Sequence, residues 1–309
     1  MKKSVLPIFL LFLVGIIACK KSSNNTVTNN NTPGPFTDIT SVFTKWVPAA
    51  KTVTIDAATG GSFYTNNGSR VIITPGCFQT STGGTVTGNV QVQVQDYLSK
   101  ADMIFSGVLP ISNGEPLISG GEFFISATQA GQPLVLKPFS TFRVNLPQSG
   151  AGTTGMQLFT AVTPATGNVN WRAKIQDTAT GTGIVIDGDT ISLFNDSLQF
   201  CNADRFMSSP NYQSFKINIT GVTLTDSSKI HAWAVYDNFN GMWGMQSITN
   251  GVITEGHVPD IPVHFLIIGI INGNLYSGIK ATTPASDSVY TIILSPIDTT
   301  SLKNQVSKL

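Results

Sequence analysis

The sequence predicts an all-β protein made of two β-sandwich-like domains, and three observations lead to this fold class. Short runs of alternating apolar and polar residues recur along most of the chain, as in strands with one face on a core. Turn-forming pairs such as Gly-Gly, Asn-Gly and Pro-Gly separate these runs. Charged residues make up only 11 % of the chain, and uncharged polar residues take their place, as is typical of β-rich proteins outside the cytoplasm.

The N-terminus carries the signals of export. Lys2 and Lys3 precede a short apolar run at 5–17, which is typical of a signal peptide covering residues 1–18. The run is shorter than the roughly 20 apolar residues of a spanning helix, although an uncleaved anchor helix remains the alternative. Cleavage would remove both lysines and leave 16 basic against 17 acidic residues. A near-neutral chain of this kind offers no basic surface for nucleic acid.

The end of the apolar run indicates a lipid anchor. The sequence Ile16-Ile17-Ala18-Cys19 resembles the lipobox of bacterial lipoproteins, so Cys19 is the predicted lipidation site and the acyl chain a membrane partner. Residues 19–36 are rich in Asn, Ser and Thr and almost free of apolar residues. Such a segment cannot bury enough apolar surface to offset its ordering entropy, so we expect a flexible tether.

The first predicted domain covers 37–147 and is centred on 84–107. There Val90, Val92 and Val94 alternate with Gln91, Gln93 and Gln95, the pattern of a strand that is buried on one face. The segment 109–121 is the longest irregular part of this domain and a candidate contact surface. The other expected strands are, in order, an edge strand at 44–47, then 52–55, 62–65, 70–74, 122–128, 133–137 and 141–146.

The second predicted domain covers 156–309 and follows a linker at 148–155. Its apolar run at 263–273 is hydrophobic on both faces and is expected to form a central strand. A short C-terminal helix is expected within 299–309, capped by Thr300 or Ser301. The other expected strands lie at 156–162, 168–175, 183–189, 190–194, 214–224, 229–238, 274–281 and 288–294.

Several segments together resemble an uncharacterised lipoprotein family of the Bacteroidetes. They are Gly60-Gly61, VIITPGCF at 71–78, the strand at 86–107 with Asp102-Met103, and CNADRF at 201–206. The turn at 71–78 is also similar to that of the β-sandwich domain shared by ankyrins, netrin receptors and zonula occludens proteins. The resemblance implies a β-sandwich fold but says little about activity. Some eukaryotic relatives cleave themselves at His-Phe-Ser, whereas this chain has His264-Phe265-Leu266 and is expected not to.

The sequence offers few groups for catalysis or metal binding. His231, His257 and His264 are the three histidines, and none has Cys, His or a carboxylate at metal-ligand spacing. No Gly-x-Ser-x-Gly or His-Glu-x-x-His motif occurs. Asp204 and Arg205 are expected to form a structural salt bridge or to cap a turn. We therefore predict no catalytic residue, metal or cofactor, and expect Cys77 and Cys201 to be buried free thiols more readily than a bridge.

An aromatic segment at 236–246 is the best candidate for ligand contact. It is rich in Gly and Asn, as loops are, yet carries Phe239, Trp243 and Met245, which we single out as possible contact residues. Rings in such a loop can stack on a sugar or a peptide. The alternative is that the loop folds back onto its own core.

Taken together, the sequence predicts a non-enzymatic binding or structural module of the bacterial envelope, lipid-anchored to the outer membrane. A glycan or an envelope protein is the expected partner. A surface adhesin or glycan-capturing lipoprotein is the alternative, and a glycan-active hydrolase is a further one that needs paired carboxylates in a cleft. Surface-export signals of Bacteroidetes carry acidic residues directly after the lipidated Cys. Lys20 and Lys21 stand there instead, which favours the periplasmic face slightly.

Overall fold

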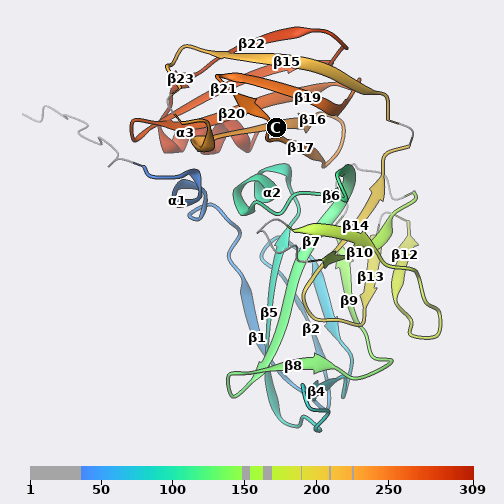
Figure 1. The fold of residues 1–309 in the computed structure, drawn as a ribbon. Coiled ribbons are helices and arrows are strands. Elements are labelled where there is room, and N and C mark those ends of the chain that lie inside the picture. Colours follow the sequence, from blue (N-terminus) through green and yellow to red (C-terminus); the bar gives the residue numbers. More distant parts are fainter. Residues whose placement is uncertain (1–35, 148–153, 163–168, 189, 209, 225) are drawn as a thin grey trace, which may run out of the picture. The chain divides into compact units, whose positions relative to one another are not determined.

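The computed structural model describes residues 36–147, 154–162, 169–188, 190–208, 210–224 and 226–309. All of them belong to one compact unit. The predicted signal peptide, Cys19 and the tether up to residue 35 lie outside the described residues, as does most of the predicted linker. Within the described residues the protein is almost all β, which confirms the predicted fold class (Figure 1).

The first two sheets form a sandwich. The first sheet has the order β1 (Lys51–Asp56), β5 (Asn89–Tyr97), β7 (Glu115–Gln129), β14 (Phe200–Phe206), β10 (Gln157–Val162) and β11 (Asn170–Ala173). β6 (Ile111–Ser112) and β8 (Gln132–Leu136) also pair with β7, and β4 (Phe78–Thr80) pairs with β8. The second sheet has the order β12 (Gly183–Asp187), β13 (Thr190–Asn195), β9 (Phe142–Leu146), β3 (Arg70–Ile73) and β2 (Gly61–Tyr64).

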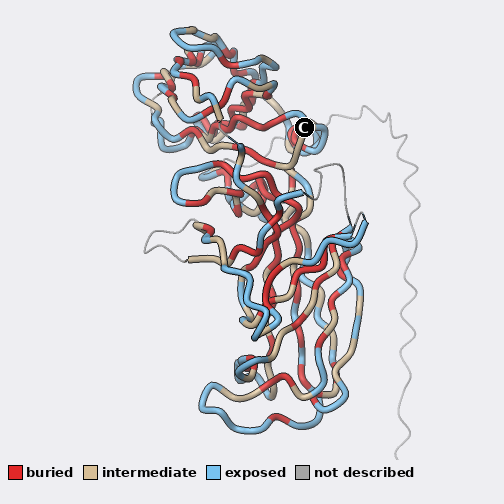
Figure 2. Tube along the Cα trace, turned by 90° about the vertical axis from the view of Figure 1, so that its right-hand side faces the viewer, coloured by how far each residue is buried: buried red, intermediate tan, exposed pale blue. Residues whose placement is uncertain are grey.

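A hydrophobic core fills the space between these two sheets. Val90, Val92 and Val94 of β5 are at most 1 % exposed, whereas Gln91 and Gln93 between them are exposed. The predicted alternation of this strand is therefore confirmed. Figure 2 colours the chain by burial and shows buried and exposed segments side by side along the strands. The valines pack in one cluster with residues of the second sheet. Burying apolar side chains in this way is the main favourable term in folding.

The predicted domain boundary at 148–155 does not separate the sheets. β10 and β14 follow that boundary in sequence, yet β14 pairs with β7, and β13 pairs with β9. Strands up to Phe206 therefore belong to the first sandwich. A linker-like composition shows only that a segment can turn, whereas strand order is decided by long-range pairing. The predicted irregular segment at 109–121 is likewise mostly β6 and the first half of β7.

The last hundred residues form a second sandwich. The third sheet has the order β18 (Ile248–Thr249), β19 (Val252–Pro259), β15 (Tyr212–Thr220) and β22 (Val289–Ile293), and the fourth has β17 (Met242–Met245), β16 (Ile230–Tyr236), β20 (Val263–Ile271), β21 (Asn274–Thr282) and β23 (Ser295–Pro296). β20 lies inside its sheet and is almost entirely buried, as predicted. Asn272 and Gly273 adopt positive φ in the turn between β20 and β21, as a tight hairpin requires.

Three α-helices and a 3₁₀ turn, η1 (Ser227–Lys229), complete the fold. α1 (Ile39–Phe43) is capped by Asp38, and it ends where the edge strand at 44–47 was predicted, so that prediction is wrong. α2 (Lys100–Ser106) was not predicted. It carries a capping box between Ser99 and Asp102. α3 (Thr299–Val306) confirms the C-terminal helix, although Asp298 caps it instead of Thr300 or Ser301.

These helices contribute to a third hydrophobic cluster, which joins the two sandwiches. Leu117, Phe159 and Trp171 come from the first sheet, whereas Trp233 and Leu266 come from the fourth. Side chains of all three helices belong to the same cluster. Each sandwich has a core of its own, and this third cluster packs the first sheet against the fourth.

Cys77 and Cys201 are both buried free thiols in the core of the first sandwich. They were expected to lie in different domains, and here they share one because β14 joins the first sheet. Burial raises the pKa of Cys77 to about 11 and that of Cys201 to about 12. Both therefore remain protonated and unreactive near neutral pH.

Candidate functional site

The candidate site is built around the hairpin of β16 and β17. In its register Trp233 lies opposite Gly244, and Ala234 lies opposite Trp243. Directly paired residues share a face of the sheet and neighbours along a strand alternate, so Trp233 and Trp243 project from opposite faces. β17 is the edge strand of the fourth sheet. A pocket lies on each side of this edge, which we name the Trp233 pocket and the Trp243 pocket.

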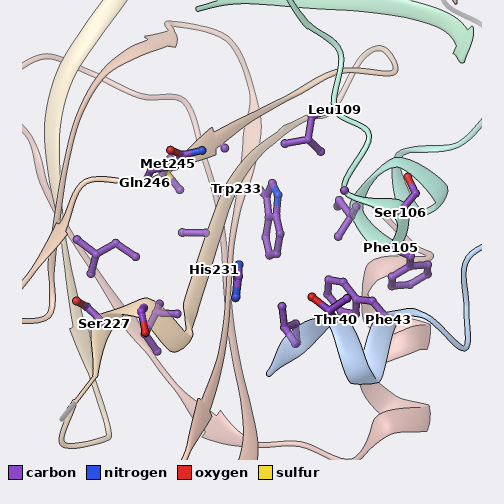
Figure 3. Close-up of a pocket in the computed structure, with 18 residues that line it drawn as sticks. Thr40, Phe43, Phe105, Ser106, Leu109, Ser227, His231, Trp233, Met245 and Gln246 are labelled. Atoms are coloured by element: carbon purple, nitrogen blue, oxygen red, sulfur yellow. The ribbon is translucent and has the colours of Figure 1, made fainter. Parts of the chain in front are cut away.

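The Trp233 pocket lies between β16, α1 and α2, and Figure 3 shows it in close-up. Its volume is about 560 Å³. The rings of His231 and Trp233 are stacked with centroids 6.0 Å apart and an angle of 18°, and Phe43 of α1 lies 6.3 Å from the same indole. Phe105 and Ser106 of α2 form the opposite wall (Figure 3). The pocket is therefore mainly an apolar and aromatic groove.

The neutral His231 ring and the missing side chain at Gly244 determine the charge and the free space of the Trp233 pocket. Burial lowers the pKa of His231, and the nearby Asp38 carboxylate only partly opposes this, so the imidazole is neutral at pH 7. Gly244 stands opposite Trp233 and has no side chain, which leaves room above the indole. A Cβ at Gly244 would meet Leu109 Cδ1 at 3.4 Å. Leu109 and Gly244 line both pockets, so the two adjoin at this point.

The Trp243 pocket has a volume of about 680 Å³ and includes several polar residues in its wall. The Trp243 and His257 rings lie 5.5 Å apart at an angle of 30°. Glu255 is buried and accepts hydrogen bonds from the backbone N–H groups of Gly256 at 2.8 Å and His257 at 2.9 Å. The indole N–H of Trp243 has no hydrogen-bond partner. Further polar groups are supplied by Asn170, Gln246, Ser247 and Thr254.

This chemistry suits binding. Glu255 Oε1 lies 3.6 Å from His257 Nδ1, so the carboxylate also helps to hold the imidazole beside Trp243. Among the described residues that line the Trp243 pocket, Glu255 is the single carboxylate. Ring faces, amides and hydroxyls around an apolar floor can hold a ligand in a fixed orientation.

The three predicted contact residues do not gather in one place. Trp243 is half-buried and lines the pocket that we name after it. Met245 is only 2 % exposed, and it lines the Trp233 pocket (Figure 3). Phe239 packs against Tyr236, with centroids 5.1 Å apart, and is not among the described residues that line either pocket.

The first half of the segment 236–246 is a loop that folds back onto the protein, which was the alternative to a ligand-contact loop. Residues 242–245 are a strand, and the remaining loop folds back onto the first sandwich. The backbone N–H of Ser119 donates to Asn240 O at 2.7 Å, and Asn240 Nδ2 donates to Leu98 O at 2.9 Å. Phe239 therefore lies in a loop that is held at its backbone and at the Asn240 amide, and its ring packs against Tyr236 instead of lining either of the two pockets.

Sequence reasoning missed Glu255, His257 and Leu109. Glu255 and His257 belong to β19 and reach Trp243 only because the third and fourth sheets stack. Of the remaining histidines, His231 stacks on Trp233, and His264 Nδ1 lies 2.7 Å from Asp237 Oδ1. Of these three residues, only Leu109 could have been found from the sequence, because it is the first residue of the segment 109–121 that was predicted to be a contact surface.

Comparison with known proteins does not identify the chain. No family model matches it, and a search of curated proteins finds no match. The resemblance to a Bacteroidetes lipoprotein family therefore stays a prediction. Among the helices in the described part of the chain, none has the length and apolar character needed to cross a bilayer. The described residues also contain no group of three or more His, Cys, Asp or Glu side chains arranged to hold a metal.

Proposed function

We propose that this chain is a lipid-anchored, non-enzymatic binding module of the bacterial envelope and that the Trp243 pocket holds its ligand. The single observation that carries this proposal is the pocket itself. It combines two adjacent aromatic rings with several amide and hydroxyl groups. Its volume falls within the roughly 300–1,000 Å³ that is usual for small-molecule sites.

A glycan is the ligand class that this lining favours. Sugars present one apolar face of C–H groups, which stacks on an aromatic ring, and a rim of hydroxyls, which pair with amides and carboxylates. Trp243 and His257 supply the rings, while Gln246, Thr254 and Asn170 supply polar partners. This supports the alternative of a glycan-capturing lipoprotein over a purely structural role.

A glycan-active hydrolase is supported less well. Glycoside hydrolysis uses two carboxyl groups on either side of the scissile bond. The carboxylate of Glu255 is already engaged by two backbone N–H groups, and no second carboxyl is among the described residues that line this pocket. The proposal for the anchor rests on the sequence around Cys19, and the outer membrane with its periplasmic face is the proposed location.

The test is a ligand screen with the full chain in a non-glycosidic detergent. We expect the wild-type protein to bind one class of glycan on an array, and the Trp243→Ala variant to lose most of that signal with little change in melting temperature. Tyr64→Ala is the matched control, since Tyr64 is a 58 % exposed aromatic residue on β2 that lines neither pocket. Equal signals from wild type and Trp243→Ala, or a collapsed melting transition in that variant, would count against the proposal.

A further inference from the structure

A buried group of oxygen atoms lies between β7 and β14, and its residues are not among the described residues that line the two pockets. In the register of these strands Glu122 is opposite Asn202 and Ser119 is opposite Asp204. Ser119 and Glu122 are three residues apart on β7, whereas Asn202 and Asp204 are two residues apart on β14. β7 therefore carries one extra residue here, which forms a β-bulge at Gly120-Gly121. The extra residue places Ser119 and Glu122 on the same face as Asn202 and Asp204. We name these four residues the carboxyl cluster.

The bulge depends on its two glycines. A Cβ at Gly120 would lie 2.9 Å from Ala203 O, and Gly121 has a φ of 138°, where a Cβ would lie 2.8 Å from Leu98 Cδ2. Neither position can accept another residue without moving its neighbours. The strand is thus shaped to bring the four polar side chains together, and bulges of this kind often re-aim side chains at functional sites.

The carboxyl cluster has many acceptors and few donors. All four residues are 0 % exposed. Asn202 Nδ2 donates to Asp204 Oδ2 at 2.7 Å, and the Gly121 N–H donates to Ser119 Oγ at 3.1 Å. Both oxygens of Glu122, Oδ1 of Asn202 and Oδ1 of Asp204 have no hydrogen-bond partner. Four buried oxygens without a donor are unusual, because buried polar atoms are nearly always paired.

Nearby residues do not supply the missing positive charge. The ion pairs among the described residues are Lys174 with Asp196, His257 with Glu255 and His264 with Asp237. The expected salt bridge of Asp204 with Arg205 does not form, because neighbours on a strand point to opposite faces. Tyr97 is the other cross-strand neighbour of Glu122, and the Trp171 indole N–H donates to Leu109 O at 2.9 Å. Burial and the nearby Asp204 raise the pKa of Glu122, and the Trp171 indole N–H opposes this only in part. Burial raises the pKa of Asp204, and the Ser119 hydroxyl opposes this only in part.

We propose that the carboxyl cluster is a structural calcium site. Its donors are all oxygen atoms, and its two carboxylates match the charge of a divalent cation. Calcium accepts carboxylate and amide oxygens in irregular arrangements of six to eight ligands, so water would complete the shell that these side chains begin, whereas magnesium requires a near-octahedral shell. Zinc favours nitrogen and sulfur donors, which this group lacks.

Within this site the ligands have distinct origins. Glu122 offers two oxygens, Asn202 and Asp204 offer one each, and the Ser119 hydroxyl faces Asp204 as a further donor. The ion would link β7 to β14, two strands that lie more than seventy residues apart in the sequence. It would also hold the centre of the first sheet directly beside the third hydrophobic cluster. The site is independent of the ligand proposed for the Trp243 pocket.

The test uses the full chain in detergent, purified without chelator. Elemental analysis is expected to find one calcium per chain. Thermal unfolding in EDTA should occur at a lower temperature than in calcium, and added CaCl₂ should restore the melting temperature while equal MgCl₂ or NaCl does not. Because the ion binds the folded state alone, the melting temperature should rise with each tenfold increase in free calcium. Terbium added in place of calcium should show luminescence sensitised by the nearby Trp171.

Two variants make the test specific. The double variant Glu122→Gln/Asp204→Asn keeps the shape of the cluster but removes its charge, so it should retain no calcium and melt at the same temperature with or without EDTA. Asp96→Asn is the matched control. Asp96 is a buried carboxyl on β5 that accepts from Thr65 Oγ1 at 2.6 Å and Ser69 Oγ at 2.9 Å, and its variant should keep the calcium response.

The result that would overturn the proposal is a wild-type chain that carries no calcium after refolding in millimolar CaCl₂ and whose melting temperature is unaffected by EDTA. The carboxyl cluster would then hold a shared proton instead of an ion. If the double variant fails to fold, the calcium content and terbium signal of the wild-type chain decide the question without it.

Discussion

A glycine-to-alanine substitution at Gly241 tests how the loop between β16 and β17 is seated on the first sandwich. A Cβ at this position would lie 2.7 Å from Leu117 O of β7, 3.0 Å from Tyr236 Cδ2 and 3.1 Å from Phe239 Cε2. The first contact is with a backbone atom, which cannot move aside as a flexible side chain can. Gly241→Ala therefore forces either the loop or β7 to shift.

Gly244 provides a matched comparison three residues further on. Neither glycine has a positive φ, so backbone strain does not distinguish them. A Cβ at Gly244 would meet only Leu109 Cδ1, at 3.4 Å, which is an ordinary contact. The difference between the two variants therefore isolates the close approach of the loop to β7.

The expected magnitude follows from the cost of overpacking. Inserting a methyl group into a packed site typically costs about 1–3 kcal/mol, and for a chain of this size each kcal/mol lowers the melting temperature by roughly 2 °C. We expect Gly241→Ala to melt about 2–6 °C below the wild type. Gly244→Ala should stay within about 1 °C, because the unfolded chain also loses entropy when glycine is replaced.

Differential scanning calorimetry of both variants beside the wild type measures this difference. Urea titration then checks that the slope of the transition is unchanged, so that the shift reflects stability and not a change in the unfolded state. Equal melting temperatures for Gly241→Ala and Gly244→Ala would refute the reasoning. That outcome would mean that the loop does not lie against Leu117 and that the two sandwiches are not joined as described.

Two further predictions concern the anchor and the carboxyl cluster. Cys19→Ala should remove the acyl mass from the purified chain and move it from the membrane to the soluble fraction, as mass spectrometry and fractionation would show; an unchanged distribution would favour the uncleaved anchor helix. In excess EDTA, urea titrations from pH 4 to pH 8 should show stability falling as pH rises. The raised pKa values of Glu122 and Asp204 mean that the folded chain holds protons that the unfolded chain releases above about pH 4, so their stabilising contribution is present at low pH and lost toward neutrality. The Glu122→Gln/Asp204→Asn variant should lose this slope, and a slope that persists in it would place the effect elsewhere.

The local parts of the fold were readable from the sequence. The alternation of Val and Gln in β5 and the doubly apolar β20 each depend on residues close in the chain, and each was predicted. α2 was missed although its signals were present, since Ser99 and Asp102 form a capping box and Gly107 ends the helix in a left-handed conformation. A helix of seven residues in a β-rich context is easily taken for the end of a strand.

The long-range parts were not readable, because they depend on which strands pair. Nothing near Met156 or Cys201 indicates that β10 and β14 extend the first sheet, so the domain boundary was misplaced. Trp243 was found because a large aromatic residue in a Gly- and Asn-rich segment is conspicuous. Glu255 was not, since it meets Trp243 only through sheet stacking. Glu122 lies in the apolar run EFFISAT, and only the bulge at Gly120-Gly121 sets it opposite Asn202 and beside Asp204.

The central claim is that Trp243 contacts a ligand, and isothermal titration calorimetry tests it most directly. The best-binding glycan from the array would be titrated into the full chain, into Trp243→Ala and into Tyr64→Ala. A truncated aromatic contact at the centre of a binding site typically costs about 2 kcal/mol or more, so we predict that Kd rises at least about tenfold in Trp243→Ala and stays unchanged in Tyr64→Ala. Equal Kd values for the wild type and a folded Trp243→Ala variant would contradict the claim and place the binding surface elsewhere.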